Sequence, residues 1–552
     1  MKINFKNENA MHIAVLIVLS YFFFMCGNGV VSLTNPDEVF YAQSAKEMMQ
    51  RSSWMTPYLF DAPNFEKPIF LYWLIRVGFI VFGISSFAVR FFPALFAAIG
   101  VAAVYGLGLI GFRDSRKSFY SALALMSSVM YLGLARSALT DTVFSVWILL
   151  ALLAFFWGYA ERSHRRLSLI LFFTSCAFAV LTKGPLGLVI PLLMVLVFLS
   201  LRRDIRYIRC FDSLWGWLVF LAVASPWYLT MIQQHNTAFT HAFFYNDHWR
   251  RLMEAEHKVN DTWYFYPLTM IAGMFPWSVF VPVSLWFLLR KDLKHLPMFS
   301  VFLLCWTGVV FVVFQAAHSK LVSYILPLFP ALALLTGDGI STVIDKRLSV
   351  RRVFVGMWGT LFVLPVALAA GLFLFPQYIS SKPAVYFLIF LFLAALALML
   401  KFIVQRRYVR VLAMSVFFCP VILYAIPLIK AGIEPYVSSR AAGEYLLQNI
   451  DPHSVVLSSK SFLRGVRYYT DKKVAILGPN FFSPHPVESM DTNERLKIFL
   501  KSRPVTYGIL RQADAEDIER MGGEEFDVTV LKVIGNEYVV KVETRTIHYA
   551  RE

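Results

Sequence analysis

Acidic and basic side chains gather in one stretch near the start of a very apolar chain. Two acids, Asp37 and Glu38, open the stretch, and Glu66 and Lys67 close it ahead of an aromatic segment that ends at Trp73. Charged groups are costly to place in a protein with 58% hydrophobic residues, so their clustering indicates a function. The carboxylates could accept a proton, and the lysine could bind an anion such as phosphate. We therefore expect a reaction centre for a charged substrate.

The start of a helix explains part of this stretch without any chemistry. Asn35 can cap a helix, and Pro36 suits its first position. Glu38 follows Asn35 by three residues, where the acid of a capping box reaches back to the cap. This alternative gives Glu38 a structural role and leaves Asp37 without one. Both acids are retained as catalytic candidates.

Two more charged residues stand at the ends of apolar segments further along the chain. Asp141 begins one segment directly after Thr140, and Lys183 ends another in the run Leu-Thr-Lys-Gly-Pro. Because a helix dipole stabilises an acid at the helix start, capping is the alternative for Asp141. A lysine that extends its charge to the membrane surface is the alternative for Lys183.

The segment from Phe243 to Arg251 combines aromatic residues with charged ones. His248, Arg250 and Arg251 in it could bind a phosphate, or His248 a metal ion, while the aromatic side chains hold the segment at an interface. The alternative is a cationic loop lying on anionic lipid headgroups. Lys320, with Tyr324 one helical turn later, could reach the same phosphate.

Membrane helices are the elements that must position these residues. The mean hydropathy of +0.60 lies outside the range of soluble globular proteins. The net charge of +17 could indicate a nucleic acid partner, but Lys and Arg also collect in the short cytoplasmic loops of membrane proteins. We therefore predict a polytopic α-helical membrane protein that contacts membrane lipids and no nucleic acid.

About thirteen segments are apolar enough to cross a bilayer, since a spanning helix needs roughly 20 apolar residues. They are residues 11–32, 88–112, 118–135, 141–160, 167–181, 186–201, 214–232, 267–289, 298–315, 324–336, 353–375, 384–404 and 411–429. The strongly basic loops all fall on one side of the membrane if residues 69–85 do not span. We therefore interpret 69–85 as a juxtamembrane helix and place the N-terminus in the cytoplasm. The candidate site residues then share the opposite face.

The composition changes at residue 434 to that of a small soluble domain. Helices are predicted at 440–448 and 493–500, strands at 455–458, 474–477 and 505–510, and a closing hairpin around Gly535 and Asn536. We predict a transmembrane domain at 1–433, with juxtamembrane helices in 33–86, and a periplasmic α/β domain at 434–552. The five cysteines lie in or beside apolar segments, so no disulfide framework is indicated.

Acids, cations and a carboxylate–His pair on one face of a helical membrane protein fit one type of reaction. They suit displacement of a lipid phosphate from a sugar, where the leaving group is anionic and needs charge stabilisation. A carboxylate could act as general base on an acceptor hydroxyl. Glycine-rich phosphate loops and nucleotide-binding fingerprints are absent, which argues against soluble nucleotide chemistry.

At these residues the sequence resembles the lipid A aminoarabinose transferases, which are GT-C glycosyltransferases related to the protein O-mannosyltransferases. The resemblance runs in family order from near the N-terminus to about residue 335. Its pieces are Pro36-Asp37-Glu38 with Tyr41-Ala42, Phe65-Glu66-Lys67-Pro68 with Tyr72-Trp73, Thr140-Asp141, Leu181-Thr182-Lys183-Gly184, Pro226-Trp227, Phe243-Phe244 with His248 and Arg251, Ala272-Gly273 with Pro276-Trp277, and Lys320-Leu321 with Tyr324.

The resemblance implies a role for each candidate residue. Asp37 would be the base or would orient the acceptor, and Asp141, with Glu38 as a further candidate, would be the second acid. Glu66 and His248 would bind a divalent metal ion. The cations that hold the lipid phosphate would be Lys67, Arg251 and Lys320, with Tyr324 and Lys183 as further candidates. This sequence departs from the family at Phe40, where the family usually has a basic residue before the tyrosine.

The activity implied is inverting transfer of a sugar from an undecaprenyl-phosphate-linked donor to lipid A or a related envelope glycolipid. The sugar expected is 4-amino-4-deoxy-L-arabinose, and the expected location is the periplasmic face of the bacterial inner membrane. We expect a monomer. Transfer to a protein Ser/Thr or to a polysaccharide is the alternative within this chemistry. A transporter or flippase would instead place charges near the middle of the membrane and repeat its two halves, and no halves repeat here.

Overall fold

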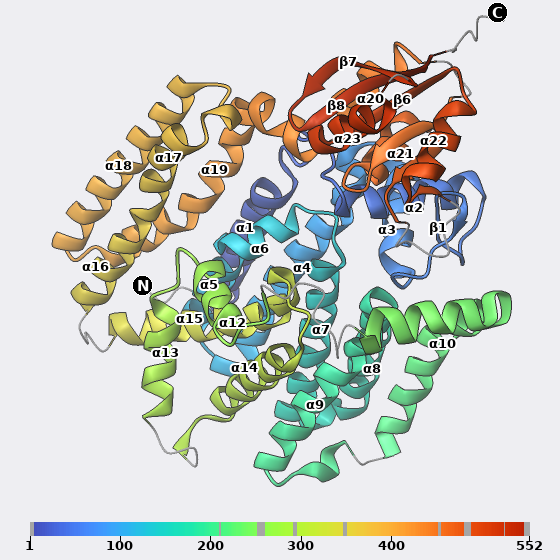
Figure 1. Cartoon of the computed structure of the whole chain (residues 1–552). Helices are drawn as coiled ribbons and strands as arrows, with labels where there is room; N and C mark the ends of the chain where they lie inside the picture. Colours follow the sequence, from blue (N-terminus) through green and yellow to red (C-terminus); the bar gives the residue numbers. More distant parts are fainter. Residues whose placement is uncertain are drawn as a thin grey trace, which may run out of the picture.

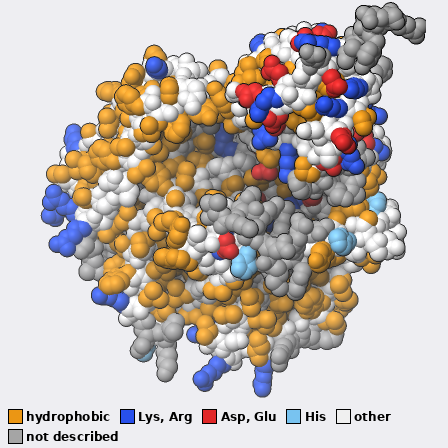
Figure 2. All heavy atoms as spheres, viewed as in Figure 1, with side chains coloured by type: hydrophobic (Ala, Val, Ile, Leu, Met, Phe, Trp, Pro, Cys, Tyr) orange, Lys and Arg blue, Asp and Glu red, His pale blue; other side chains and the backbone are white. Residues whose placement is uncertain are grey.

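The computed structural model describes residues 5–208, 211–250, 260–290, 295–345, 350–450, 454–479, 487–523 and 525–545. Figure 1 shows a large helical body, with a small domain at its upper end that contains a sheet and is formed by the C-terminal part of the chain. Hydrophobic side chains cover much of the body in Figure 2, and charged side chains crowd onto the small domain. The architecture confirms the predicted fold class.

Nine helices in the described part of the chain are long and apolar enough to cross a membrane. They are Asn7–Met25, Ser86–Phe112 (α4), Thr140–Ala160 (α7), Arg162–Lys183, Asp212–Tyr245, Met298–Ala316 (α14), Val322–Asp345, Val350–Leu374 and Lys382–Val404 (α18). Within these spans the helices are α1 (Phe5–Ser20), α8 (Arg165–Lys183), α10 (Phe211–Thr240), α15 (Phe329–Asp345), α16 (Val350–Leu361) and α17 (Val363–Leu374). The chain is therefore a multi-pass membrane protein.

Four further segments account for the rest of the predicted thirteen. Helices α5 (Ser115–Ser127) and α6 (Val129–Ala135) form one pair that is bent by 62°. Three shorter apolar helices are α9 (Leu186–Leu201), α13 (Phe280–Leu289) and Tyr408–Leu423, the first part of α19 (Tyr408–Val437). The predicted segment 267–289 is not continuous, because α12 (Phe265–Gly273) ends before Pro276 and proline cannot continue the helical hydrogen bonding.

The stretch between the first span and α4 forms a compact layer of short elements. It contains α2 (Asp37–Gln50), the short hairpin of β1 (Tyr58–Leu59) and β2 (Ala62–Pro63), and α3 (Phe70–Phe82). With 13 residues, α3 is only about 20 Å long and cannot cross a hydrocarbon core of about 30 Å. Although α2 is rich in polar residues, most of its side chains are buried, including Gln43 and Glu47.

The C-terminal domain has a six-stranded sheet with the order β5-β4-β3-β6-β8-β7. The first four of these pair in parallel, and the β7–β8 hairpin adds the antiparallel edge. The predicted helices and strands are present as α20 (Arg440–Leu447), β3 (Val456–Ser459), β4 (Val474–Leu477), α22 (Asn493–Lys501), β6 (Val505–Leu510), β7 (Phe526–Ile534) and β8 (Glu537–Thr544). Three further elements were not predicted from the sequence: α21 (Leu463–Thr470), β5 (Glu488–Met490) and α23 (Gln512–Gly522).

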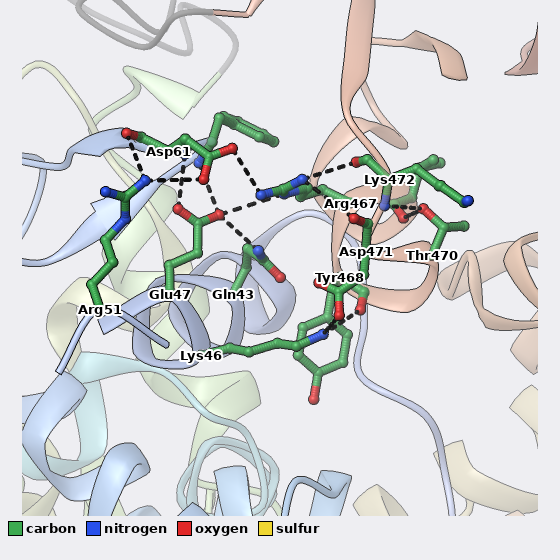
Figure 3. A network of polar contacts seen from close by, with 12 residues as sticks. Gln43, Lys46, Glu47, Arg51, Asp61, Arg467, Tyr468, Thr470, Asp471 and Lys472 are labelled. Carbon is green, nitrogen blue, oxygen red and sulfur yellow. Dashed lines mark hydrogen bonds and ion pairs between the residues drawn. The ribbon is translucent and has the colours of Figure 1, made fainter. Parts of the chain in front are cut away.

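Helix α21 packs directly against α2 and joins the two parts of the molecule. Arg467 of α21 lies 2.9 Å from the carboxylate of Asp61 and 3.6 Å from that of Glu47, while Lys46 of α2 lies 2.8 Å from Asp471. Figure 3 shows these side chains converging from both parts of the chain. Arg467 and Glu47 are buried, so this contact is shielded from water. We refer to this network as the α2–α21 clamp.

A second set of contacts attaches residues 32–35 to the same domain. The backbone N–H of Ser32 donates to Glu434, the N–H of Leu33 donates to the hydroxyl of Tyr469, and the amide of Asn35 donates to Ser439. A Cβ atom on Gly465 of α21 would lie 2.1 Å from the Asn35 side chain, so only glycine allows this approach. The chain that leads into α2 is thus fixed by the C-terminal domain.

Candidate active site

Glu38 is part of a buried ion pair that holds the start of α2. Its carboxylate lies 2.5 and 2.7 Å from the guanidinium of Arg90 in α4, and both side chains are almost fully buried. It also accepts hydrogen bonds from the backbone N–H groups of Thr34 and Ala138. These partners keep the pKa of Glu38 below its ordinary value in spite of burial. With its oxygens occupied in this way, Glu38 is placed to organise the site and is a poor candidate for proton transfer.

The predicted capping box is wrong in detail. Glu38 reaches back to the N–H and hydroxyl of Thr34, one residue earlier than expected. Asn35 makes no capping hydrogen bond to α2, and its side chain instead donates to Ser439 in the C-terminal domain. Contacts with the C-terminal domain have replaced the local cap. Asp37 stands in the first turn of α2 next to Glu38, whose carboxylate is bound to Arg90.

Asp37 remains accessible to solvent at the start of α2, yet the surrounding protein removes enough water to raise the pKa of its carboxyl. The positive charge of Arg464 opposes this shift, and the charges of Asp141, Glu38 and Glu66 add to it. Asp37, Glu66 and Asp141 are therefore close enough to interact electrostatically.

Glu66 is positioned by a buried asparagine and contacts the C-terminal domain. The backbone N–H of Glu66 donates to the side chain of Asn64, whose amide donates to Ser44 and Tyr72. The carboxylate of Glu66 lies 3.4 Å from the guanidinium of Arg464. Lys67 donates to the backbone carbonyl of Glu66 at 2.9 Å. The charge of Glu66 also acts on Asp37, so Glu66 belongs to the same group of acids.

Asp141 and Lys183 form an ion pair between two membrane helices. The ammonium of Lys183, at the end of α8, lies 2.5 Å from the carboxylate of Asp141 in the first turn of α7. The same ammonium lies 4.4 Å from the centre of the Tyr324 ring, a distance at which a cation is attracted by the ring. Tyr41 of α2 hydrogen-bonds Thr140. The two charges stand in the first turn of α7 and the last turn of α8, as the capping and snorkelling alternatives expect, and in addition they pair with each other.

Lys320 is buried and paired with an acid that the sequence analysis did not single out. Its ammonium lies 2.5 Å from Asp261, which also contacts His318 at 2.8 Å. These two partners lower the pKa of Asp261. Tyr324 lies in the same 3₁₀ segment that follows Lys320, η7 (Val322–Leu328), and connects this group with Lys183. The charge of Lys320 is thus already balanced by Asp261.

Two predicted site residues cannot be placed. Arg251 and the side chain of His248 lie outside the residues that the structure describes. Within the described residues, no group of three or more His, Cys, Asp and Glu side chains could hold a metal ion. The described residues therefore do not complete a metal site, and the divalent ion predicted at Glu66 and His248 stays a prediction.

The structure adds one residue to the cluster that no sequence motif indicated. Arg464 of α21 approaches both Glu66 and Asp37, and its guanidinium carbon lies 4.4 Å from the centre of the Phe40 ring. A recognisable signal was the pattern Leu463, Val466 and Thr470, typical of one helical face, with Arg464 and Arg467 on another. The pattern spans only two turns, so it did not stand out.

Comparison with known proteins relates this chain to transferases whose names include a lipid-linked sugar. A family profile described as dolichyl-phosphate-mannose-protein mannosyltransferase matches residues 10–243, a range that contains Asp37, Glu66, Asp141 and Lys183. The chain is 28% identical over 382 residues to the undecaprenyl phosphate-alpha-4-amino-4-deoxy-L-arabinose arabinosyl transferase of Photorhabdus laumondii, covering 68% of this chain and 66% of that protein.

A protein of the same name from Pectobacterium atrosepticum is 31% identical over 346 residues, which are 61% of this chain and 60% of the relative. The chain thus spans slightly less than two thirds of the length of these relatives. Among solved structures, ArnT from Cupriavidus metallidurans bound to undecaprenyl phosphate matches with a TM-score of 0.77 at 21% identity, over 96% of this chain and 97% of ArnT. The chain has the ArnT fold.

The ArnT fold includes the C-terminal domain, since the structural match covers nearly the whole chain. An archaeal oligosaccharyltransferase, AglB from Archaeoglobus fulgidus, is a more distant match, with a TM-score of 0.54 at 12% identity, covering 92% of this chain and 69% of AglB. The predicted resemblance to ArnT-like GT-C proteins is confirmed. The domain boundary at residue 434 and the roles of the individual site residues stay predictions.

Proposed function

We propose that this chain is an integral-membrane glycosyltransferase that uses an undecaprenyl-phosphate-linked sugar. The acceptor would be lipid A or a related envelope glycolipid, and the sugar 4-amino-4-deoxy-L-arabinose. The observation that carries the proposal is the meeting of Asp37, Glu66, Asp141 and Lys183 in an ArnT fold, although these residues come from four separate segments. The names of the similar transferases supply the donor, the sugar and, by family, the acceptor.

The reaction would be a single displacement at the sugar. An acceptor oxygen attacks the anomeric carbon while the bond from that carbon to the lipid phosphate breaks, which inverts the configuration. The departing phosphate gains negative charge, and Lys67 and Lys183 are the described cations placed to stabilise it. Lys183 would do so by exchanging part of its contact with Asp141 for the phosphate.

The role of Asp37 depends on the acceptor. A hydroxyl must lose its proton, and an ionised Asp37 could accept it. A phosphate monoester on lipid A is already largely ionised at neutral pH, because its second pKa is about 6. In that case Asp37 would orient the attacking oxygen or bind the amino group of the sugar. A carboxylate that interacts with three further acids is well suited to a cationic amine.

The proposed location is the bacterial inner membrane, with the site on the periplasmic side. Figure 2 supports this orientation, because Lys and Arg side chains also gather at the edge of the body away from the C-terminal domain. Cationic loops mark the cytoplasmic side of membrane proteins. We also propose a monomer and a divalent ion at Glu66 and His248. Light scattering and metal analysis of the purified chain check these two points.

Mass spectrometry of lipid A from cells with and without this protein tests the function. The expected result is an added mass of one aminoarabinose on lipid A, which is lost with Asp37→Asn combined with Lys67→Ala. A purified chain supplied with labelled undecaprenyl-linked sugar should label lipid A and not protein. Label found in protein alone would favour transfer to Ser/Thr, which the mannosyltransferase profile over residues 10–243 makes the second candidate.

A further inference from the structure

Arg464 brings a positive charge from the C-terminal domain into the group of acids around Asp37. Its side chain is only 11% exposed, and its guanidinium lies over the ring of Phe40 at 4.4 Å. The contact with Glu66, at 3.4 Å, is at the outer limit of a hydrogen bond. Arg464 thus reaches the site beside an aromatic ring and an acid.

The position of Arg464 is fixed by the helix that carries it. Arg467, one turn later on α21, is bound to Asp61 and Glu47 in the α2–α21 clamp (Figure 3). Gly465, the next residue, packs against Asn35 immediately before α2. Because both neighbours contact α2 or the segments beside it, the backbone that carries the guanidinium is held on each side.

Charge balance shows what this guanidinium could bind. Asp37, Glu66 and Asp141 bring three carboxylates together, and the ammonium of Lys183 is paired with Asp141. Phe40 carries no charge, and its ring lies under the guanidinium of Arg464. A phosphate group that enters beside Asp37 and Glu66 is repelled by these carboxylates, and Arg464 adds to Lys67 the positive charge that offsets this repulsion. A guanidinium suits this role, because its planar set of donors matches the oxygens of phosphate.

We propose that Arg464 is a phosphate-binding residue of the active site, supplied by the C-terminal domain in the place where position 40 lacks a charge. This proposal rests on the proposed function and extends it. The ligand is a phosphate group, which could belong to the prenyl donor or to the lipid acceptor. The C-terminal domain then acts in substrate binding as well as in holding α2.

Binding measurements on the purified full-length chain in detergent test the proposal. The probes are undecaprenyl phosphate, with undecaprenol as its uncharged counterpart, and lipid A, with dephosphorylated lipid A as its counterpart. Arg464→Gln should weaken binding of one phosphorylated probe by about ten- to a hundredfold and leave the uncharged counterparts unchanged. The matched control is Arg495→Gln in the same domain, where Arg495 is exposed and pairs with Asp491. It should bind all probes as the wild type does.

Weaker binding of undecaprenyl phosphate assigns Arg464 to the donor, and weaker binding of lipid A assigns it to the acceptor. Wild-type affinity of Arg464→Gln for both probes would overturn the proposal. If Arg464→Gln does not fold, Arg464→Lys takes its place, since it keeps the charge and loses the planar donors. A several-fold loss of affinity supports the proposal, and wild-type affinity overturns it.

A second variant tests the shared position of the two cations. Phe40→Arg in the Arg464→Gln background should restore affinity, because its charge would occupy the same space. A folded double variant with no recovery would contradict the shared position. The wild-type chain separates this inference from the proposed function. If the wild type binds neither probe and transfers no sugar, the proposed function fails, whereas normal wild-type activity with unaffected Arg464→Gln removes only the role of Arg464.

Discussion

The ammonium of Lys183 lies 2.5 Å from the carboxylate of Asp141, and the pair joins the end of α8 to the start of α7. Both side chains are largely buried, so neither charge is well hydrated. Buried pairs of this kind cost much more when one partner is removed than when both are replaced together. Comparing single and double variants of this pair therefore distinguishes its contribution to stability from its contribution to sugar transfer.

Lys183→Met should lower stability by about 3 kcal/mol, because Asp141 is left without its cation. The double variant Asp141→Asn with Lys183→Met should recover most of this stability. Sugar transfer should stay low in both variants, because the leaving phosphate loses a cation in each. Thermal unfolding in detergent and a transfer assay on the same samples provide the measurement. Recovery of transfer along with stability would show that the pair is structural only.

Glu38→Ala should destabilise the chain strongly, by about 3–5 kcal/mol. It leaves the buried guanidinium of Arg90 uncompensated and removes the acceptor for the N–H groups of Thr34 and Ala138. The control is Glu444→Ala, which breaks an exposed pair with Arg440 and should cost less than about 1 kcal/mol. The unfolding temperature and the yield of monodisperse protein measure the stability of the two variants. A stable but inactive Glu38→Gln would return Glu38 to the catalytic candidates.

The pH dependence of transfer should show the raised pKa of Asp37. If the ionised carboxylate is required, activity falls as the pH drops through a pKa above the ordinary value of 3.8. Asp141→Asn removes a negative charge and should move this acid limb to lower pH. Arg464→Gln removes the opposing positive charge and should move it to higher pH. Profiles of kcat/KM against pH for the two variants and the wild type test these opposite shifts. Movement of the acid limb in the same direction in both variants would contradict the effects assigned to Asp141 and Arg464.

Glu537 should make stability depend on pH near neutrality. Burial raises its pKa from 4.5 to about 7, although Ser439 donates a hydrogen bond to it. Because the folded state holds this proton more tightly than the unfolded state, the stabilising effect is complete below pH 4.5 and is lost as the pH rises through 7. Glu537→Gln should flatten this dependence between those values. Thermal unfolding across the range measures it, and an unchanged slope would contradict the assignment.

Much of the helical body was predictable because membrane spans depend on local composition. Long apolar runs such as 86–112 and 382–404 need no distant partner to be recognised. The same holds for most of the C-terminal sheet, where β4 and β6 coincide with the predicted segments. Short elements with a weak hydrophobic pattern were not predicted. The most important of them is α21, whose eight residues mix arginine, tyrosine and apolar side chains.

The sequence by itself determined the membrane fold and the candidate residues Asp37, Glu66, Asp141 and Lys183, because hydrophobicity and side-chain chemistry are written along the chain. Only the tertiary structure decided what each charge contacts. In the structure Glu38 pairs with Arg90 and Lys320 pairs with Asp261. Glu66 contacts Arg464, which is 398 residues away along the chain. The physical reason is that an ion pair depends on distance and burial in space, and neither quantity follows from the separation of residues along the chain.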